Sequence, residues 1–586
     1  MIVMQDTQMD SCIVNPQSKL PVGISNFAQV IQDGYCLVDK SLFIREVLDS
    51  GGGVTLITRP RRFGKTINLN MLSCFLSQPA NAQSDLFDGL AISQQGIQYQ
   101  QERGKRAVLF LSLRKVKESS WNDAYTRLIG LLSDLVQHNC QDASTGKLTD
   151  RQQRVLKEVQ AGTATPAECK ATLAILTELL TLKHNGMTPW VLMDEYDAPM
   201  QAAYQHGYYK QMRDLMKGLL GDCFKDNPFL HRAVLTGIVR VAKEDIFSDL
   251  NNLGVFGTLD DRFADCFGFV EHEVKQLLEQ RNLSHHFETI QQAYNGYCFG
   301  HDKPAMVYNP WSVVRFVSQP TKEAPLYWVN TSDNHLVHKL LTQANPQVKQ
   351  GLHELLSKTS HHSTTQILKE HVPLRFLENS SEHLWGLLLA SGYVTAVSRQ
   401  TKPETLEQMV KLRIPNQEVL SVYNDLLRRW LTSGSGASGA SLLDALVAGQ
   451  VQEFAAHFER FVYESMSYFD KQGNEPERFY HGFVLGMMHY LRDRYIVDSQ
   501  RESGLGRYDL ALEPKDKTLP GFVMEFKTCV RETDSLTDTV QQALQQIQDK
   551  QYHMNLMKRG VQTIIALGFA FRGKEVTVKH TTLAKT

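Results

Sequence analysis

Two groups of residues in this sequence have the types and spacing that chemistry on phosphate groups requires. The first lies at Gly53 to Thr66, GVTLITRPRRFGKT, where an apolar strand leads through a short loop into Gly64-Lys65-Thr66 and an amphipathic stretch. This order places Lys65 and the backbone N–H groups of the loop at a helix N-terminus, where oriented donors and the helix dipole favour a phosphate. The segment therefore predicts a phosphate-binding loop.

The loop departs from the usual phosphate-binding loop, which carries a glycine five residues before its Gly-Lys pair. Arg59 stands at that position, and the triple glycine at 51–53 precedes the strand and cannot substitute for it. A Gly-Lys-Thr tripeptide alone is weak support, because helix starts carry it by chance. The assignment therefore needs support from a second motif elsewhere in the chain.

An acidic pair at the end of a second apolar strand supplies that support. Residues 191–195 read VLMDE. In nucleoside-triphosphate hydrolases such a strand lies beside the phosphate-loop strand, its Asp binds Mg²⁺ through water, and its Glu polarises the attacking water. We predict these roles for Asp194 and Glu195, and a contact of Thr236, near the end of a further strand, with the γ-phosphate or that water. The alternative interpretation is that Asp194 and Glu195 only cap a helix.

The second group lies at Gly506 to Lys527, GRYDLALEPKDKTLPGFVMEFK. The strand period of two separates an apolar face from an acid-bearing face in each half of this segment. The apolar faces hold Tyr508, Leu510, Leu512, Phe522, Met524 and Phe526. The opposite faces hold Asp509, Ala511, Glu513, Gly521, Val523, Glu525 and Lys527.

A hairpin centred near Lys517 places Asp509 opposite Glu525, because both lie eight residues from the centre. Facing like charges are unfavourable unless a cation lies between them, and their oxygen atoms suit Mg²⁺ or Mn²⁺. Lys527, on the same face, is then placed to orient or deprotonate the water that attacks a phosphodiester, or to stabilise developing charge. The pattern predicts a nuclease with Asp509, Glu525 and Lys527 as catalytic residues; a solvated edge pair is the alternative.

Length and composition bound the architecture that must position these residues. The 586 residues predict three or four compact units, and 42% hydrophobic with 21% charged residues excludes collagen-like, coiled-coil and wholly disordered chains. The net charge of -1 means that any nucleic-acid surface is a local patch. Nine singly scattered cysteines are expected to be reduced. With no signal-peptide pattern and no apolar run long enough for a bilayer, we expect a soluble, cytoplasmic protein.

The fold class predicted from the pattern is α/β. Residues 20–258 alternate short apolar segments with amphipathic stretches, which indicates a parallel sheet covered by helices. Its strands are predicted at Gly53 to Thr58, Ala107 to Leu113, Trp190 to Met193 and His231 to Gly237. Residues 259–431 are mainly helical and look like a lid or adaptor, and residues 432–441, TSGSGASGAS, predict a linker. Residues 442–586 predict a helix, to about Ser465, and a second α/β unit.

Several segments together resemble the bacterial AAA-ATPase-like family that carries a PD-(D/E)XK nuclease domain at its C-terminus. The resemblance covers nearly the whole chain and rests on TRPRRFGKT, VLMDEYDAP, LTGI, FSDLNNLG, YNGYCFG, VYNPWS, LASGYVTA and LRIPN. It implies an AAA-like P-loop NTPase domain and a C-terminal restriction-endonuclease-like domain. It also implies that arginine at position 59 is the rule, that Lys65 and Thr66 take the phosphates of ATP and Mg²⁺, and that Asp194 and Glu195 form the acidic pair.

The candidate sites combine both lines of argument. The nucleotide site consists of Arg59, Pro60, Arg61, Arg62, Phe63, Gly64, Lys65, Thr66, Asp194 and Thr236, with Thr66 and Asp194 as metal ligands. The three guanidiniums either stabilise transferred charge or bind a carboxylate of the same domain, and we favour a structural role.

The second site has Asp509 and Glu525 as metal ligands. Gln546 or Gln548, together with Tyr552, resembles the glutamine and tyrosine found beside such metal sites. Spacing does not decide whether Glu477 or Glu502 adds a ligand, and His481 is expected to pack within a helix.

The sequence thus predicts an ATP-binding and ATP-hydrolysing protein coupled to a Mg²⁺- or Mn²⁺-dependent nuclease, with DNA favoured over RNA as partner. Two alternatives stay open. One is a nucleotide-dependent switch whose C-terminal domain binds nucleic acid or protein without cutting it, and the other is an ATP site that binds but hardly turns over. A homo-oligomer is compatible with an AAA-type fold, although no residue requires it.

Overall fold

The structure is a computed structural model that divides into two compact units: residues 1–340 with 365–419, and residues 341–364 with 420–586. It describes residues 13–77, 85–140, 146–241, 246–247, 250–328, 335–342, 344–356, 363–369, 377, 380–402, 405, 407–423, 439–465, 484, 487–488, 491, 493–499, 502–503, 506–529, 534–572 and 575–585. Of the predicted middle region, residues 259–431, the parts 259–340 and 365–419 therefore fall within the first unit.

A five-stranded parallel sheet forms the centre of the first unit, in the order β4-β5-β6-β3-β7. Its strands are β3 (Val54–Thr58), β4 (Val108–Ser112), β5 (Trp190–Asp194), β6 (Arg232–Gly237) and β7 (Leu253–Phe256). We expected the strand that ends at Asp194 to lie beside the phosphate-loop strand, and this was wrong. β6 pairs with both β3 and β5 and separates them, so its residue Thr236 lies between the two motifs.

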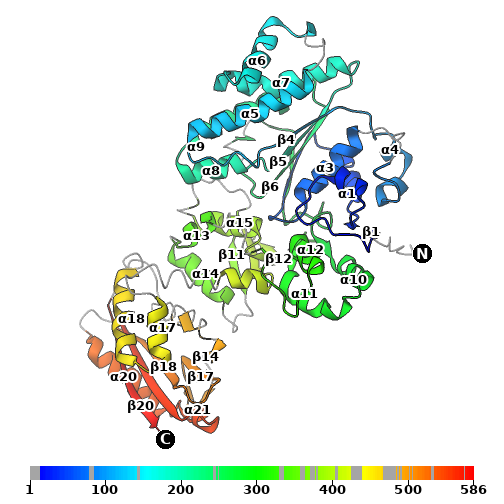
Figure 1. The fold of residues 1–586 in the computed structure, drawn as a ribbon. Coiled ribbons are helices and arrows are strands. Elements are labelled where there is room, and N and C mark those ends of the chain that lie inside the picture. The colour runs from blue at the N-terminus through cyan, green and yellow to red at the C-terminus, as the bar shows by residue number, and fades with distance from the viewer. Residues whose placement is uncertain are drawn as a thin grey trace. The chain divides into compact units, whose positions relative to one another are not determined.

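Helices cover both faces of this sheet (Figure 1), as the buried strands require. On one face lie α1 (Phe27–Gln32) and α3 (Lys65–Ser77), which pack against each other. The helices of the other face and its edge are α5 (Trp121–Asn139), α6 (Asp150–Ala161), α7 (Pro166–Lys183), α8 (Ala198–His206) and α9 (Tyr209–Phe224). Capping boxes at Thr149 and Thr165 satisfy the first N–H groups of α6 and α7.

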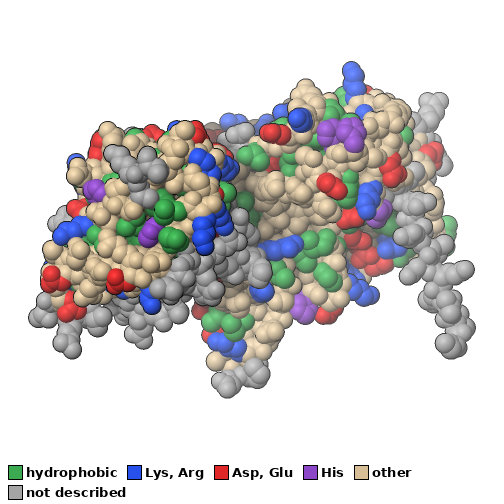
Figure 2. Space-filling view, turned by 90° about the horizontal axis from the view of Figure 1, so that it is seen from below, with side chains coloured by type: hydrophobic (Ala, Val, Ile, Leu, Met, Phe, Trp, Pro, Cys, Tyr) green, Lys and Arg blue, Asp and Glu red, His purple; other side chains and the backbone are tan. Residues whose placement is uncertain are grey.

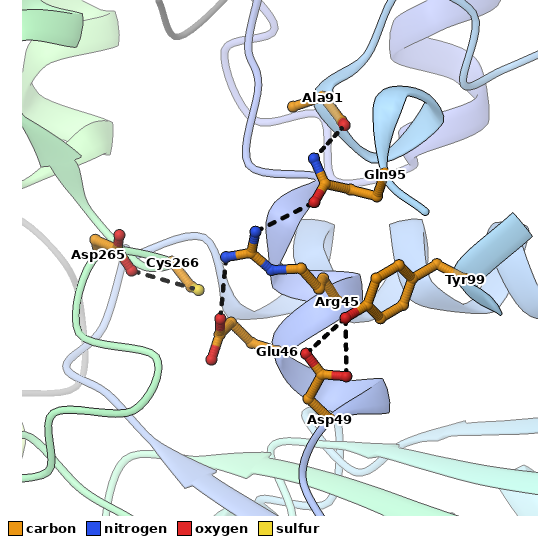
Figure 3. Close-up of polar contacts among 8 residues, drawn as sticks. All are labelled: Arg45, Glu46, Asp49, Ala91, Gln95, Tyr99, Asp265 and Cys266. Atoms are coloured by element: carbon orange, nitrogen blue, oxygen red, sulfur yellow. Dashed lines mark hydrogen bonds and ion pairs between the residues drawn. The ribbon is translucent and has the colours of Figure 1, made fainter. Parts of the chain in front are cut away.

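A polar network joins α2 (Leu42–Leu48) to the segment after α3 that contains η1 (Ala91–Gln94) and α4 (Ile97–Gln100). Arg45 contacts Glu46 and donates to the Gln95 side chain at 3.2 Å, and the Tyr99 hydroxyl donates to Asp49 at 2.9 Å (Figure 3). These contacts hold α2, which precedes the phosphate loop, against η1 and α4, which follow α3.

The middle region contains small sheets as well as helices. One sheet has the order β8-β10-β9 and the other β11-β13-β12. The strands are β8 (Phe269–Val270), β9 (Tyr297–Phe299), β10 (Ala305–Tyr308), β11 (Ser363–Ile367), β12 (Thr395–Thr401) and β13 (Gln408–Arg413). The helices include α10 (Glu271–Gln280), α11 (Phe287–Tyr294), α12 (Pro310–Ser318), α13 (His335–Thr342), α14 (Pro346–Leu356) and α15 (Ser381–Ser391).

The second unit is built on the sheet β14-β17-β18-β19-β20, in which only β18 and β19 pair in parallel. The strands are β14 (Tyr495–Ser499), β17 (Leu510–Pro514), β18 (Gly521–Thr528), β19 (Thr563–Arg572) and β20 (Glu575–Lys585). Short strands β15 (Glu502–Ser503) and β16 (Gly506–Arg507) pair separately, and β1 (Ile13–Val14) pairs with β2 (Leu37–Val38) in the first unit.

Both faces of the second sheet are buried. On one face α17 (Gly439–Val447) and α18 (Val451–Ser465) pack with Leu510, Met524 and Phe526. On the other face α20 (Leu536–Asp549) and α21 (Met554–Lys558) pack with Ala511 and Val523. The single helix expected to Ser465 is two helices, since the chain turns at 448–450; residues 432–438 of the predicted linker lie outside the described residues.

The chain has nearly equal numbers of basic and acidic residues, 62 and 63. On the face in Figure 2 both basic and acidic side chains are visible among the described residues. The eight cysteines of the described part are free thiols. Among the described helices, none has the length and apolar character that a membrane crossing needs.

Candidate functional site

The carboxyl ends of neighbouring strands bring Thr66, Asp194 and Thr236 together. Thr66 is the second residue of α3, which follows the loop after β3, whereas Asp194 ends β5. The Asp194 side chain is buried, and its Oδ2 accepts from Thr66 Oγ1 at 2.9 Å while its Oδ1 accepts from Thr236 Oγ1 at 2.7 Å. Two hydroxyls from adjacent elements therefore fix one orientation of this carboxylate.

Lys65 lies under the loop that precedes it. Its Nζ donates to the carbonyl oxygen of Arg59 at 3.0 Å and to that of Pro60 at 2.8 Å, and only 7% of the residue is exposed. Burial lowers the pKa of Lys65 to about 8, against the opposing effect of the nearby carboxylates Glu195 and Asp194. A phosphate bound here would compete with two carbonyl groups for this ammonium.

The Arg59 side chain points away from the loop into the protein. Its Nη1 donates to the carbonyl oxygens of Thr58, Phe256 and Gly257, and its Nη2 to those of Arg262 and Phe263. Its guanidinium also lies over the rings of Phe267 and Phe299. Arg59 is therefore a structural anchor, and the candidate role of its side chain in nucleotide binding is not supported.

The middle region packs around the other loop residues. Phe63 meets the ring of Tyr297 edge-on at 4.9 Å, and the Arg62 guanidinium lies 4.3 Å from the ring centre of Trp311. A Cβ at Gly392, the residue that ends α15, would come within 2.9 Å of Pro60. Arg62 (φ +70°) and Gly64 (φ +83°) adopt left-handed conformations that turn the loop. Any rearrangement of the loop would therefore disturb its contacts with the middle region.

Basic residues lie around Glu195, which itself has a left-handed backbone (φ +50°). Arg114, just after β4, forms an ion pair with Glu195, with 3.8 Å between Nε and Oε1. Burial lowers the pKa of Arg61, while electrostatic interactions with the Tyr393 hydroxyl and with the carboxylates of Asp197 and Glu195 act the other way. Of the two remaining loop arginines, Arg61 interacts electrostatically with Glu195 and Asp197. The Arg62 guanidinium stacks on Trp311, and the negative charge of Glu195 also acts on it.

The hairpin of the second unit has the predicted register. Leu510 lies opposite Met524 and Leu512 opposite Phe522, so the centre of the hairpin is at Lys517 and the same register places Asp509 opposite Glu525. Asp509 precedes β17, and its Oδ2 accepts from the backbone N–H of Phe526 at 2.9 Å. The two acidic residues therefore lie on adjacent segments at the same level of the sheet.

One assignment of faces was wrong. Tyr508 was expected beside Leu510 and Leu512, but it packs with Ala511, Val523 and Tyr552 on the opposite face. The strand begins only at Leu510, so the period of two does not extend back to Tyr508. An aromatic side chain is thereby added to the face that carries the acidic residues.

Gln546 of α20 connects the side chains of this site. Its Oε1 accepts from Lys527 Nζ at 2.8 Å, and its Nε2 donates to Glu525 Oε1 and, at 3.4 Å, to the Tyr552 hydroxyl. Glu525 is only 4% exposed. Of the two glutamines considered from the sequence, Gln546 contacts the site and Gln548 faces solvent.

The donor set fits a divalent cation with oxygen ligands. Burial raises the pKa of Tyr552, and the negative charges of Glu525 and Asp509 contribute to the rise, so both carboxylates act on the same hydroxyl. Carboxylate and amide oxygens suit Mg²⁺ or Mn²⁺. Among the described residues no group of three or more His, Cys, Asp or Glu is placed to hold a metal. Glu477, His481 and the side chain of Glu502 lie outside what the structure describes.

Comparison with known families agrees with the two constellations. Residues 21–247 match the family described as predicted AAA-ATPase, and residues 475–581 match the PD-(D/E)XK nuclease superfamily. The chain joins an AAA-ATPase-like domain to a PD-(D/E)XK nuclease-superfamily domain. A relative from Azotobacter chroococcum mcd 1, named as an uncharacterized protein in the vnfD 5' region, is 26% identical over 95% of this chain and 96% of its own length. No solved structure matches the chain significantly.

Sequence reasoning missed Asp197 in the AAA-ATPase-like domain. Its buried carboxylate accepts from the backbone N–H groups of Ile238 and Val239 at 3.0 and 2.9 Å. Next to it, the Tyr196 hydroxyl donates to Val239 O at 2.7 Å and accepts from Val241 N at 3.0 Å. These bonds clamp the segment after Glu195 onto the end of β6. The third acid in VLMDEYDAP was the available signal.

Proposed function

We propose that this protein binds and hydrolyses ATP and that its nucleotide state controls a metal-dependent nuclease that cleaves phosphodiester bonds, with DNA favoured over RNA. The observation that carries the nuclease half is the amide of Gln546, which contacts both Glu525 and Lys527 while Asp509 lies at the same level of the sheet. The Thr66–Asp194–Thr236 contacts support the ATPase half.

In the ATPase half, each residue has a role that follows from its position. Lys65 exchanges its loop carbonyls for phosphate oxygens, and the loop N–H groups at the start of α3 contribute further donors. Thr66 and Asp194 would hold Mg²⁺, and Thr236 keeps Asp194 oriented. Glu195, at the strand end, accepts a proton from the attacking water.

In the nuclease half, Asp509 and Glu525 would hold Mg²⁺ or Mn²⁺. The bound cation would polarise the phosphate and lower the pKa of a water molecule. Lys527 orients that water or donates to the phosphate oxygen on which charge develops. Gln546 holds Lys527 and Glu525 in a fixed spacing, so that neither side chain must reorganise when the substrate arrives.

The coupling of the two activities rests on the packing of the phosphate loop. Phe63, Arg62 and Pro60 contact Tyr297, Trp311 and the α15 terminus. We infer that nucleotide occupancy shifts this loop and with it the middle region, and that this movement gates access to the nuclease residues.

The nuclease is tested by incubating the full chain with single-stranded, duplex and structured DNA and RNA, with Mg²⁺ or Mn²⁺, in the presence and absence of ATP. Glu525→Gln should lower cleavage by at least about 100-fold, because a carboxylate ligand is lost. Glu575→Gln, an exposed position on β20, is the matched control and should cut like wild type. Absence of metal-dependent cutting on every substrate would reject the nuclease.

The ATPase is tested separately. Glu195→Gln should bind ATP normally but hydrolyse it roughly 10²- to 10⁴-fold more slowly, as expected for the loss of a general base. Equal hydrolysis by wild type and variant would favour an ATP site that binds but hardly turns over.

A second function is favoured by the net charge of -1, because a processive nuclease usually carries a basic channel. In this alternative the protein is a nucleotide-dependent switch whose C-terminal domain binds nucleic acid or protein without cutting it. A Glu525→Ala variant with unchanged DNA affinity and unchanged biological effect would support the switch over the nuclease.

We propose that the protein is cytoplasmic. We also propose four parts of the chain: an AAA-ATPase-like domain at 20–258, a lid or adaptor region at 259–431, a linker at 432–441, and a helix with a nuclease-like domain at 442–586. Size-exclusion chromatography with light scattering, with and without ATP, tests the homo-oligomer that an AAA-type fold allows.

A further inference from the structure

A cavity of about 330 Å³ lies beside the nuclease residues and has no role in the chemistry proposed above. Its lining includes Ile496 and Asp498 from β14, Tyr508, Tyr552, and Asn555 and Arg559 from the α21 segment. Its volume is at the lower end of the range of about 300–1,000 Å³ for small-molecule sites. The cavity therefore has room for one ring-sized group and not for a duplex.

The cavity opens on the same face of the sheet as the acidic residues. Asp498 lies opposite Ala511, and Ala511 opposite Val523, which is two residues from Glu525 along β18. Tyr552 lines the cavity and also receives a hydrogen bond from Gln546, which contacts Glu525. A group in the cavity would thus be separated from the catalytic residues by a single side chain.

The charge in the cavity does not favour a phosphate. Glu513, another lining residue, forms ion pairs with Lys517, at 2.8 Å, and with Arg559. The hydrogen bond to Glu513 and the negative charge of that residue chiefly raise the pKa of Arg559, with a smaller contribution from Asp498. The cations here are thus already balanced by carboxylates, and a further anion would be repelled by the negative charges of Glu513 and Asp498.

The remaining chemistry suits a neutral planar ring with a polar edge. The Tyr508 and Tyr552 rings lie 6.2 Å apart with planes at 72°, and Ile496, which is 44% exposed, adds apolar surface. Aromatic side chains bind unstacked bases of any sequence. Asp498 can accept a hydrogen bond from an amino group, as carboxylates do from the N4 amino group of cytosine, and the Asn555 amide can both donate and accept.

We propose that this cavity binds one unstacked nucleobase with an exocyclic amino group, within a single-stranded segment of the substrate cut at Asp509, Glu525 and Lys527. A base inside a duplex cannot reach such a cavity, so the bound strand must be single or locally opened. The assignment of the base to a substrate strand rests on the proposed nuclease function, whereas the recognition of the base itself does not.

Binding is measured by fluorescence anisotropy with the full chain in EDTA, so that no metal-dependent cleavage enters the result. The probes are labelled 12-nucleotide strands of dC and dT. Wild type should bind the dC strand about fivefold or more tightly than the dT strand, the low end of the discrimination given by a hydrogen-bonded base edge. Ile496→Trp, which fills the cavity, and Asp498→Leu, which removes the hydrogen-bond acceptor, should abolish this preference.

The matched control is Met557→Trp, an exposed position on α21 outside the cavity lining, which should keep the preference. Thermal unfolding equal to that of wild type shows that a variant is folded. If Ile496→Trp is not folded, the result for Asp498→Leu decides. Equal binding of dC and dT by wild type, or a preference that survives both cavity variants, overturns the proposal. The proposal is also overturned if free dCMP competes with the labelled probe as effectively as an unlabelled dC strand does, since the cavity would then bind free nucleotide.

The two proposals fail in different ways. A dC preference without cleavage under any metal condition leaves the base site standing and removes the nuclease. Cleavage without a preference between dC and dT leaves the nuclease standing and removes the base site.

Discussion

Gly237→Ala gives a direct test of the clamp that positions Glu195. Gly237 ends β6, and a Cβ there would lie 2.6 Å from the Tyr196 ring and 2.7 Å from Asp197 Oδ1. Neither neighbour can withdraw, because Tyr196 is bonded to Val239 and Val241, and the Asp197 carboxylate accepts two backbone N–H groups. The substitution must therefore displace the segment that follows Glu195.

The expected loss of stability is about 2–3 kcal/mol, the upper part of the range for overpacking a buried site. For a unit of about 400 residues, whose unfolding entropy is about 2.1 cal/mol/K per residue, that corresponds to a fall of about 2–4 °C in the unfolding transition of the first unit, measured by scanning calorimetry. ATP hydrolysis should fall as well, since Glu195 moves with the displaced segment, whereas binding of ATP depends on the loop and should change less.

Gly221→Ala is the matched control. Gly221 lies in α9, and an added Cβ there meets nothing within 4 Å, so alanine should stabilise the helix by roughly 0.5–1 kcal/mol. The change in unfolding free energy is therefore expected to be negative for Gly237→Ala and positive for Gly221→Ala. A Gly237→Ala protein as stable and as active as wild type would show that the clamp does not constrain Glu195.

Three further outcomes are expected from burial and contacts. Because the pKa of Lys65 is about 8 in the free protein, the lysine loses its charge above pH 8, and ATP affinity should fall there by up to about tenfold per pH unit. Titration calorimetry measures this affinity and should find no such fall for the Lys65→Arg variant. Gln546→Leu should weaken metal-dependent cleavage about 10- to 100-fold, with exposed Gln548→Leu unchanged. Burial raises the pKa of Glu418 from 4.5 to about 7, so the folded protein binds more protons there than the unfolded chain. The free energy of unfolding should therefore fall by roughly 3 kcal/mol in all as the pH rises from 4.5 to 7. Denaturant titrations of the Glu418→Gln variant should lack this fall.

The strands and the hairpin register could be predicted from sequence because their signals are local. The predicted ends of β3, β4, β5 and β6 differ from the observed ends by at most one residue, since each is a short apolar run between polar turns. The register of β17 and β18 could be obtained by counting residues to the centre of a tight turn.

The features that were missed depend on residues distant in sequence. The position of β6 between β3 and β5 is decided by packing of the whole sheet, which no local pattern encodes. Arg59 looks like part of a basic loop until the carbonyls of residues 256–263, about 200 positions away, are brought to it. Gln546 and Gln548 flank the apolar stripe of α20 equally well in helical periodicity, so only the docked helix separates them.

The two sites share one electrostatic arrangement. In each, an acidic side chain is oriented by neutral donors: the hydroxyls of Thr66 and Thr236 on Asp194, and the amide of Gln546 on Glu525. The neighbouring lysines are likewise bonded to neutral acceptors, Lys65 to two carbonyls and Lys527 to the Gln546 oxygen.

A direct lysine–carboxylate ion pair at either site would have to be broken before a cation and a phosphate could bind, at the cost of leaving both charges buried and unpaired. Neutral partners avoid that cost. They hold both charges in position and leave the negative charge of the acid for a metal and the positive charge of the lysine for a phosphate. The arrangement therefore favours ligand binding over the stability of the empty site, as expected where a protein must bind a metal and a phosphate together.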